Sequence, residues 1–398
     1  MRRLRPGLWL AVIAVTVQLA WYGMLGISYF RAPGVLEGAD FVFYYATGRV
    51  AREHGLGSVY RLDLSAAAQA ETTGLSPEAG EFFLPNHPPF LYPLAALLAG
   101  LPYRAAYLYF AGLLLLLAAA GLPVLAGALR RNGWPASAVW IALAGILLFE
   151  PLFVSILKGQ DSVLLLLGGL LWLSGMLRED DRMAGLGLAL TLIRPQVAVI
   201  LALPFLFRRR GIWWWFAAGG LALGLYSLLL VGWQGALDYL HVLSLSAGGA
   251  GYGMSEAGMF NFTGLLVRLL PAADPAFVHT LGWGLLALAL AVLCVLWRLA
   301  KSIRVRHVTL AVSLGLFAAP HLHYHDLALL SVPLLGVGLA AAAAGRLEVR
   351  RAAALTMAAS LLLLFAELWD PLRSTLPYLL MLALPAIAWR LESRPRPA

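Results

Sequence analysis

The sequence predicts an all-helical protein that crosses a membrane many times. Hydrophobic residues make up 61% of the 398 residues, and the mean hydropathy is +0.81, whereas a soluble domain is roughly 45–50% apolar. Apolar runs of about 20 residues recur along the chain, which is the length that a helix needs to cross the hydrocarbon. The runs are continuous in Leu and Ala rather than alternating, so the pattern favours helices over strands.

The distribution of basic residues predicts the orientation of these helices. A net charge of +9 is also found in nucleic-acid-binding proteins, but here the basic residues gather at the ends of apolar runs, where they set topology. Arg2, Arg3 and Arg5 precede the first run, so we expect a cytoplasmic N-terminus. The run over 7–30 lacks a small-residue cleavage site and is expected to be a retained span.

Residues 31–103 then form an extracytoplasmic loop, which holds most of the polar sequence outside the apolar runs. Between Asp40 and His54, aromatic and small residues share one helical face, which predicts a helix lying in the membrane interface. A second short helix is expected over 64–72. The stretch 88–101 is apolar but short and proline-containing, so we expect it to be re-entrant or interfacial rather than spanning.

The later apolar segments alternate across the membrane so that each basic cluster falls on the cytoplasmic side. The expected segments are 104–129, 136–157, 162–177, two short arms (183–193 and 196–207), 212–232, 276–299, 308–320, 326–345, 351–368 and 375–390. A Gly-rich outer loop covers about 233–275. The whole chain, 1–398, is predicted to be a single integral-membrane domain of about 10 to 12 transmembrane helices, with both termini in the cytoplasm.

Polar residues at the outer ends of apolar segments are candidates for function, because a polar side chain near the hydrocarbon costs free energy. Asp40 could cap the helix that follows it, or it could act as a general base, since a carboxylate with a pKa of about 3.9 is ionised at neutral pH. The two roles are compatible.

A second group of candidates lies at Lys158 and at Arg194. Lys158 and Gln160 could contact a phosphate or a sugar, or they could form an interfacial turn with a snorkelling lysine; Asp161 could cap the next helix. Arg194 and Pro195 interrupt an apolar stretch, and an arginine there would otherwise face lipid. We therefore predict that Arg194 binds an anion near the start of a helix.

Three alternate histidines, His321, His323 and His325, precede Asp326. Such a tract is compatible with a metal site. In a helix, however, alternate residues point to different faces, which favours hydrogen bonding to substrate or phosphate. No cofactor is expected, and a divalent metal stays an open alternative.

Taken together, several short motifs resemble one family. These are Asp40-Phe-Val-Phe-Tyr44-Tyr45, Gly55, Val59-Tyr60, Pro88-Pro89-Phe90 with Pro93, Gly159-Gln160, Arg194-Pro195, and Pro320 to Asp326 with Pro333. In this order, over about 37–335, they resemble the polyprenol-phosphate-mannose-dependent mannosyltransferases of the GT-C glycosyltransferase fold.

The resemblance implies a GT-C-like helical bundle whose active site faces away from the cytoplasm. It implies a polyprenyl-phosphate sugar as donor and a catalytic carboxylate in the first outer loop, which is Asp40 here. The family's lysine before proline is Arg194 in this chain, which keeps the charge but not the geometry. Tyr44, Tyr45 and His87 are further candidate substrate contacts.

The sequence therefore predicts an inverting transfer of a sugar, expected to be mannose, from a polyprenyl phosphate to a lipid or glycan acceptor. The reaction is expected on the extracytoplasmic side of the plasma (inner) membrane, with Asp40 as base and no nucleic acid involved. The alternative is a transporter or flippase of a lipid-linked sugar, which also needs polar groups and broken helices. The long outer loop and the absence of a recognisable inverted repeat favour the transferase.

Overall fold

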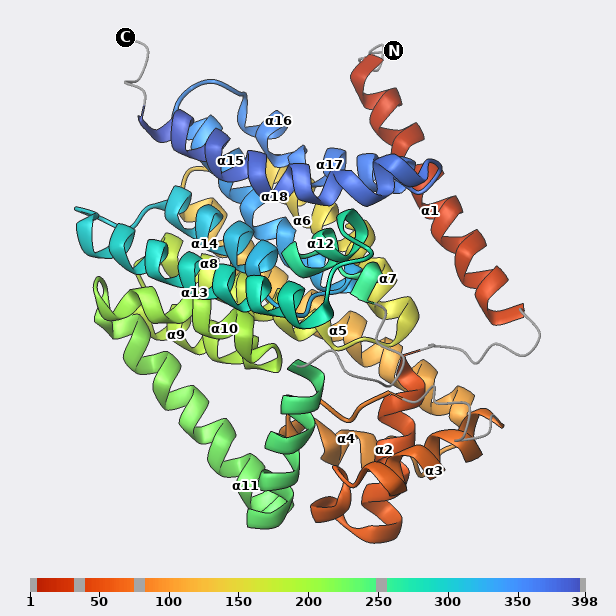
Figure 1. Cartoon of the computed structure of the whole chain (residues 1–398). Coiled ribbons are helices and arrows are strands. Elements are labelled where there is room, and N and C mark those ends of the chain that lie inside the picture. Colours follow the sequence, from red (N-terminus) through yellow and green to blue (C-terminus); the bar gives the residue numbers. More distant parts are fainter. Residues whose placement is uncertain (1–5, 32–39, 75–82, 248–255, 394–398) are drawn as a thin grey trace.

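The computed structural model describes residues 6–31, 40–74, 83–247 and 256–393, and throughout these ranges the secondary structure is helical, with no strand (Figure 1). The chain is an all-helical polytopic membrane protein. Arg2, Arg3 and Arg5, which predict a cytoplasmic N-terminus, lie outside the described residues. The first predicted span is helical, as α1 (Pro6–Arg31).

The first loop folds as predicted into short helices. They are α2 (Phe41–His54), η1 (Leu56–Ser58), α3 (Leu62–Thr73), η3 (Pro89–Leu91) and α4 (Tyr92–Leu98). The predicted face of α2 is buried at Phe41, Tyr44 and Gly48, because α2 packs against both α3 and α4. With η3 and α4 the apolar stretch is only 10 residues long. At about 1.5 Å of rise per residue it is too short to cross a membrane.

Among the described residues, five helical segments are long and apolar enough to cross a membrane alone. They are α5 (Tyr103–Arg131), α11 (Arg210–Ala247), α13 (Pro275–Leu299), Tyr324–Ala343 (η7, Tyr324–Leu330, with α15, Ser331–Ala343) and α18 (Asp370–Ser393). Shorter apolar helices follow the predicted segments elsewhere. They are α8 (Ser162–Arg178), α10 (Pro195–Ala202) with η5 (Leu203–Leu206), α14 (Val305–Ala318) and α17 (Leu355–Ala366), the last preceded by α16 (Val349–Ala353). In the described ranges, single helices of spanning length are thus fewer than the predicted 10 to 12, because several apolar segments are broken.

The breaks occur where the sequence places helix-interrupting residues. Helices α6 (Ala136–Leu147) and α7 (Glu150–Lys158) form one apolar segment bent by 42° and count as a sixth span only if taken together. Helix α9 (Asp181–Leu190) and η4 (Thr191–Ile193) end at Arg194, and α10 starts at Pro195, as the two predicted arms require.

Helix α11 kinks at Gly232, where the predicted span 212–232 ends. Gly232 has φ of 69°, a backbone conformation that favours glycine. Beyond the kink the expected Gly-rich loop is instead helical up to Ala247, and residues 248–255 lie outside the description. This second arm packs against η1 and η3 of the first loop, with the rings of Tyr60 and Tyr239 4.9 Å apart (Figure 1).

A buried polar network stabilises the bend between α6 and α7. The carbonyl oxygen of Leu148, left without a helical partner at the bend, accepts hydrogen bonds from Gln18 at 2.6 Å, Tyr22 at 2.9 Å and Ser360 at 2.7 Å. Polar backbone groups must be paired inside a membrane protein. Side chains from α1 and α17 therefore pair the free backbone carbonyl at the bend, and these hydrogen bonds fix the position of the bend.

Candidate active site

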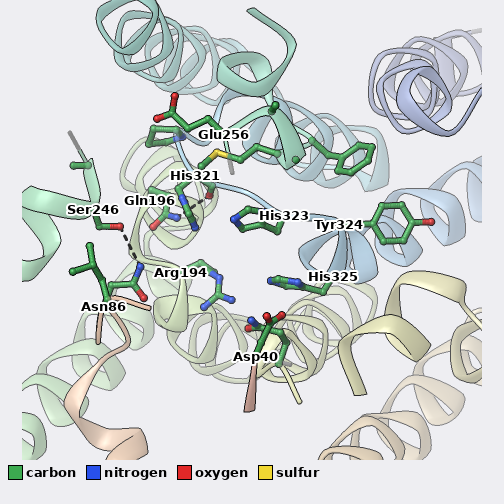
Figure 2. Close-up of a pocket in the computed structure, with 18 of the residues that line it drawn as sticks. Asp40, Asn86, Arg194, Gln196, Ser246, Glu256, His321, His323, Tyr324 and His325 are labelled. Atoms are coloured by element: carbon green, nitrogen blue, oxygen red, sulfur yellow. Dashed lines mark hydrogen bonds between the residues drawn. The ribbon is translucent and has the colours of Figure 1, made fainter. Parts of the chain in front are cut away.

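A cavity of about 1280 Å³ lies where the first loop meets the broken helices. Its wall comes from the start of α2, the segment 83–87, the end of α7, the break before α10 and the ends of α11, α13 and α18. Figure 2 shows Asp40 and His325 near its centre, with Asn86 and Ser246 on one side and Tyr324 on the other.

Asp40 is placed in this cavity by its own backbone. Its amide donates to the carbonyl oxygen of Lys158 at 3.1 Å, which ties the start of α2 to the end of α7. Asp40 occupies the N-cap position, but its side chain makes no capping hydrogen bond. The helix-cap interpretation is therefore wrong, and the carboxylate instead faces His323 and His325 (Figure 2).

Gly159 explains why Lys158 and Asp40 can lie so close together. It has φ of 70°, and a Cβ atom there would lie 2.7 Å from Cβ of Phe41. Glycine is required on both counts. The turn presents Lys158 and Gln160 to the cavity. The side chain of Lys158 is exposed and forms no salt bridge with any residue in the described ranges.

Arg194 is placed differently from the prediction. It is buried between two carboxylates, Asp161 and Asp326, each with one oxygen 3.1 Å from a guanidinium nitrogen. Its charge is therefore already balanced, although the side chain still borders the cavity. An anion at this position would meet a guanidinium that two carboxylates already balance, and the binding of an anion by Arg194 stays a prediction. We call Asp161, Arg194, Asp326 and His87 the buried ion cluster.

The other members of the buried ion cluster hold neighbouring segments in place. His87 lies 3.4 Å from Asp161, and the Ser162 hydroxyl donates to Asp326 at 2.6 Å. Asp161 was expected to cap α8, yet its side chain makes no capping bond there. Burial by itself would raise the pKa of Asp161, but the charges of His87 and Arg194 lower it to about 2. Asp161 is thus ionised over the physiological range.

The three histidines line one wall of the cavity. The rings of His321 and His323 are 4.8 Å apart, and those of His323 and His325 are 5.7 Å apart. The other carboxylate oxygen of Asp326 accepts the backbone amide of His323 at 3.2 Å. Burial lowers the pKa of His321 to about 3 and also lowers the pKa of His323. Within the described ranges, no group of three His, Cys, Asp or Glu side chains is arranged to hold a metal ion.

The predicted site residues thus fall into three groups. Asp40, Lys158, Gln160, His87, Arg194, His321, His323 and His325 all line the cavity. Tyr44 and Asp326 are buried behind it. Tyr45 was predicted as a substrate contact, but it is not among the residues that line the cavity. Its hydroxyl donates to the carbonyl oxygen of Leu101 at 2.9 Å.

The cavity also contains residues that the sequence did not single out. Glu256 and His279 pair at 2.8 Å, and Arg268 donates to the carbonyl oxygen of Met259 at 2.9 Å. The hydroxyl of Tyr324 donates to the buried carboxylate of Glu150. Tyr324 and Glu150 are 174 residues apart, so no local pattern marks this pair.

One comparison with known proteins gives a match. The model described as glycosyltransferase family 87 matches residues 83–320, more than half of the chain. A search of the curated proteins finds no match. The matched range includes Lys158, Gln160 and Arg194, whereas Asp40 and the three histidines lie outside it.

Proposed function

Because the chain belongs to glycosyltransferase family 87, we propose that it transfers a sugar, mannose, from a polyprenyl-phosphate donor to an acceptor hydroxyl with inversion. The proposal rests above all on one observation. The cavity holds a carboxylate, Asp40, that makes no capping hydrogen bond, and a cation, Lys158, that forms no salt bridge within the described residues. Asp40 and Lys158 are joined there by a backbone hydrogen bond of 3.1 Å. Membership in a glycosyltransferase family favours transfer over transport of a lipid-linked sugar.

In the proposed reaction Asp40 is the general base. It takes the proton of the acceptor hydroxyl while the acceptor oxygen forms a bond to the anomeric carbon of the donor sugar. The bond from that carbon to the phosphate oxygen breaks, and its electron pair leaves with the lipid phosphate. An inverting transfer needs one such base, placed on the acceptor side of the reacting carbon.

Lys158 is the proposed partner of the leaving phosphate. Its ammonium group is not used by a salt bridge with any described side chain, whereas the charge of Arg194 is balanced by Asp161 and Asp326. A free cation stabilises negative charge that develops on the leaving oxygen. We assign the phosphate to Lys158, with His323 and Gln160 as neutral hydrogen-bonding neighbours, and we include no metal ion in the mechanism.

The apolar part of the cavity suits the polyprenyl chain of the donor. Val199 of α10 and Trp283 of α13 are both 43% exposed and lie on the cavity wall with Leu286 and Leu290. An apolar strip that leads from a polar cavity can hold a hydrocarbon chain beside the membrane. This supports a lipid-linked donor rather than a soluble nucleotide sugar.

The proposed location follows from the basic residues. With both termini in the cytoplasm, the first loop and the cavity face the extracytoplasmic side of the plasma (inner) membrane. Cysteine accessibility mapping tests this. Labelling of a cysteine near Asp40 by an impermeant reagent from outside is expected, and labelling only after the membrane is opened would contradict the orientation.

The test of the reaction is transfer from radiolabelled polyprenyl-phosphate mannose in membranes that contain the wild type or Asp40→Asn at matched levels. We expect loss of at least about a hundredfold in rate in the variant, since general base catalysis typically contributes that much or more. Asp63→Asn, on the exposed surface of α3, is the control and should keep full activity. Equal transfer by wild type and Asp40→Asn would eliminate Asp40 as the base.

A further inference from the structure

Two basic segments meet at the end of the molecule that lies away from the first loop. One covers 208–210, where η5 passes into α11, and the other covers 298–304, at the end of α13. The side chain of Arg208 donates to the carbonyl oxygen of Lys301, 93 residues later in the chain. Helix η5 also packs against α13, and Figure 1 shows the start of α11 and the end of α13 at the same edge of the molecule. The two segments therefore form one surface.

This surface carries positive charge that no described carboxylate balances. Its exposed cations form no salt bridge within the described ranges, and we call them the basic patch: Arg208, Arg210, Arg298, Lys301 and Arg304. Two neighbouring cations are balanced instead, since Arg209 donates to Asp181 at 2.9 Å and Arg306 lies 3.7 Å from Glu392. These two carboxylates are therefore used by cations outside the basic patch.

Exposed apolar and aromatic side chains adjoin the basic patch. Phe207 and Leu299 are each next in sequence to one of its cations, and both are exposed. Trp214 and Trp215 are exposed near the start of α11. Tryptophan is enriched at the level of lipid headgroups, and apolar side chains next to cations suit the boundary between headgroups and acyl chains. The basic patch thus has the surroundings of a site at the bilayer surface.

Basic residues at the ends of spans set topology, and that role alone does not make a binding site. The basic patch differs because it joins two loops that are distant in sequence, and its charge has no partner in the described ranges. A cluster of four or more Lys and Arg residues beside spanning helices attracts the headgroups of anionic lipids. None of its five cations lines the cavity, so the charge is not part of the candidate active site.

We propose that the basic patch binds the phosphodiester headgroup of an anionic membrane phospholipid. The acyl chains lie along the outer faces of α11 and α13, where Leu221 and Val295 are exposed. In the orientation proposed above, this lipid belongs to the cytoplasmic leaflet. The inference goes beyond the proposed function, and it holds whether or not the cavity transfers a sugar.

The test measures the affinity of the purified protein, in neutral detergent, for fluorescently labelled phosphatidylglycerol and for phosphatidylcholine with the same label. We expect the anionic lipid to bind at least about tenfold more tightly than the zwitterionic one. Arg298→Gln with Lys301→Gln removes two side chains that form no hydrogen bond or salt bridge in the described ranges. This double variant should weaken phosphatidylglycerol binding by about 20- to 30-fold, since each cation near an anionic lipid contributes about fivefold.

The matched control is Arg130→Gln with Arg131→Gln, at the end of α5. It removes the same charge from two exposed arginines of another basic cluster. We expect it to leave phosphatidylglycerol affinity within about twofold, because charges beyond a Debye length are screened. Equal losses in the two double variants would show that the lipid responds only to net charge, and they would overturn the site.

Other outcomes would also contradict the basic patch as a lipid site. Equal affinity of the wild type for the two lipids would exclude a preference for anionic headgroups. Displacement of phosphatidylglycerol by excess polyprenyl phosphate would mean that it occupies the cavity beside Lys158 instead. Thermal melting shows whether each variant is folded. If the variant at Arg298 and Lys301 melts early, the single variant Lys301→Gln decides the result, with an expected loss of about fivefold.

Discussion

Lys158 and Asp161 lie in the same turn, yet they belong to two regions with opposite properties. Lys158 lies in the cavity beside Asp40, and neither side chain is paired with a described residue. Asp161 belongs to the buried ion cluster, in which every charge contacts an opposite one. Charge alone therefore does not mark a reacting group in this protein. Compensated charges hold the broken segments together, and uncompensated ones are available for chemistry.

The largest expected effect follows from replacing Arg194, the central residue of the buried ion cluster. Arg194→Met leaves two buried carboxylates without their cation, which is expected to cost about 3–5 kcal/mol of stability. Thermal melting of the purified protein measures the loss. The double variant Arg194→Met with Asp326→Asn should recover part of it, because one buried charge is removed. A stable Arg194→Met variant that loses only donor affinity would restore Arg194 as a phosphate ligand.

Removal of the free cation should have the opposite signature. Lys158→Ala is expected to reduce the transfer rate by about ten- to a hundredfold, since it removes one group that stabilises developing charge. Its melting temperature should match that of the wild type, because no described residue depends on the ammonium group. Lys158→Arg keeps the charge and should recover much of the rate. A Lys158→Ala variant with a melting temperature below that of the wild type would show that Lys158 stabilises the fold instead.

The two regions should also respond to pH in different windows. The folded pKa of His321, about 3, lies below its unfolded value of about 6.5, so the unfolded chain binds the extra proton. Stability is then complete above about pH 6.5 and falls as pH decreases from there. Asp161, with a folded pKa of about 2, contributes stability above about pH 3.9 that is lost only below it.

Melting curves from pH 8 to pH 4 test this assignment. The first decline, which begins near pH 6.5, should be shallower in His321→Ala than in the wild type. Asp161→Asn should leave the slope of that first decline unchanged, although its overall stability is lower. A decline that His321→Ala does not alter would show that the folded protein takes up the proton at this position without cost.

The smallest expected effect is that of metal removal. In the proposed mechanism Lys158 stabilises the leaving phosphate and no step uses a metal ion, so a chelator should change the transfer rate by less than about twofold. Membranes treated with EDTA and assayed with the labelled donor provide the measurement. A rate that collapses with EDTA and returns on addition of one divalent cation would contradict the metal-free mechanism.

Much of the fold could be predicted from the sequence. The runs of Leu and Ala predict helices, because backbone N–H and C=O groups in lipid must form hydrogen bonds within their own segment. Helices α1, α5, α13 and α18 follow the predicted segments closely. The break at Arg194-Pro195 was also expected, since proline acts on its own local backbone, and the end of a span at residue 232 was expected as well. The helical arm after Gly232 was not predicted, because its packing on the first loop is a long-range contact.

The candidate site shows more clearly what could not be predicted from the sequence. The sequence determined which polar residues lie at the ends of apolar segments, and it singled out Asp40, Lys158 and Arg194. It could not distinguish a free charge from a paired one, because the partners of Arg194 lie 33 residues before it and 132 residues after it. Only the tertiary structure decided that Arg194 is balanced and that Asp40 is not used as a helix cap. The physical reason is that burial and electrostatic compensation depend on which segments meet in space.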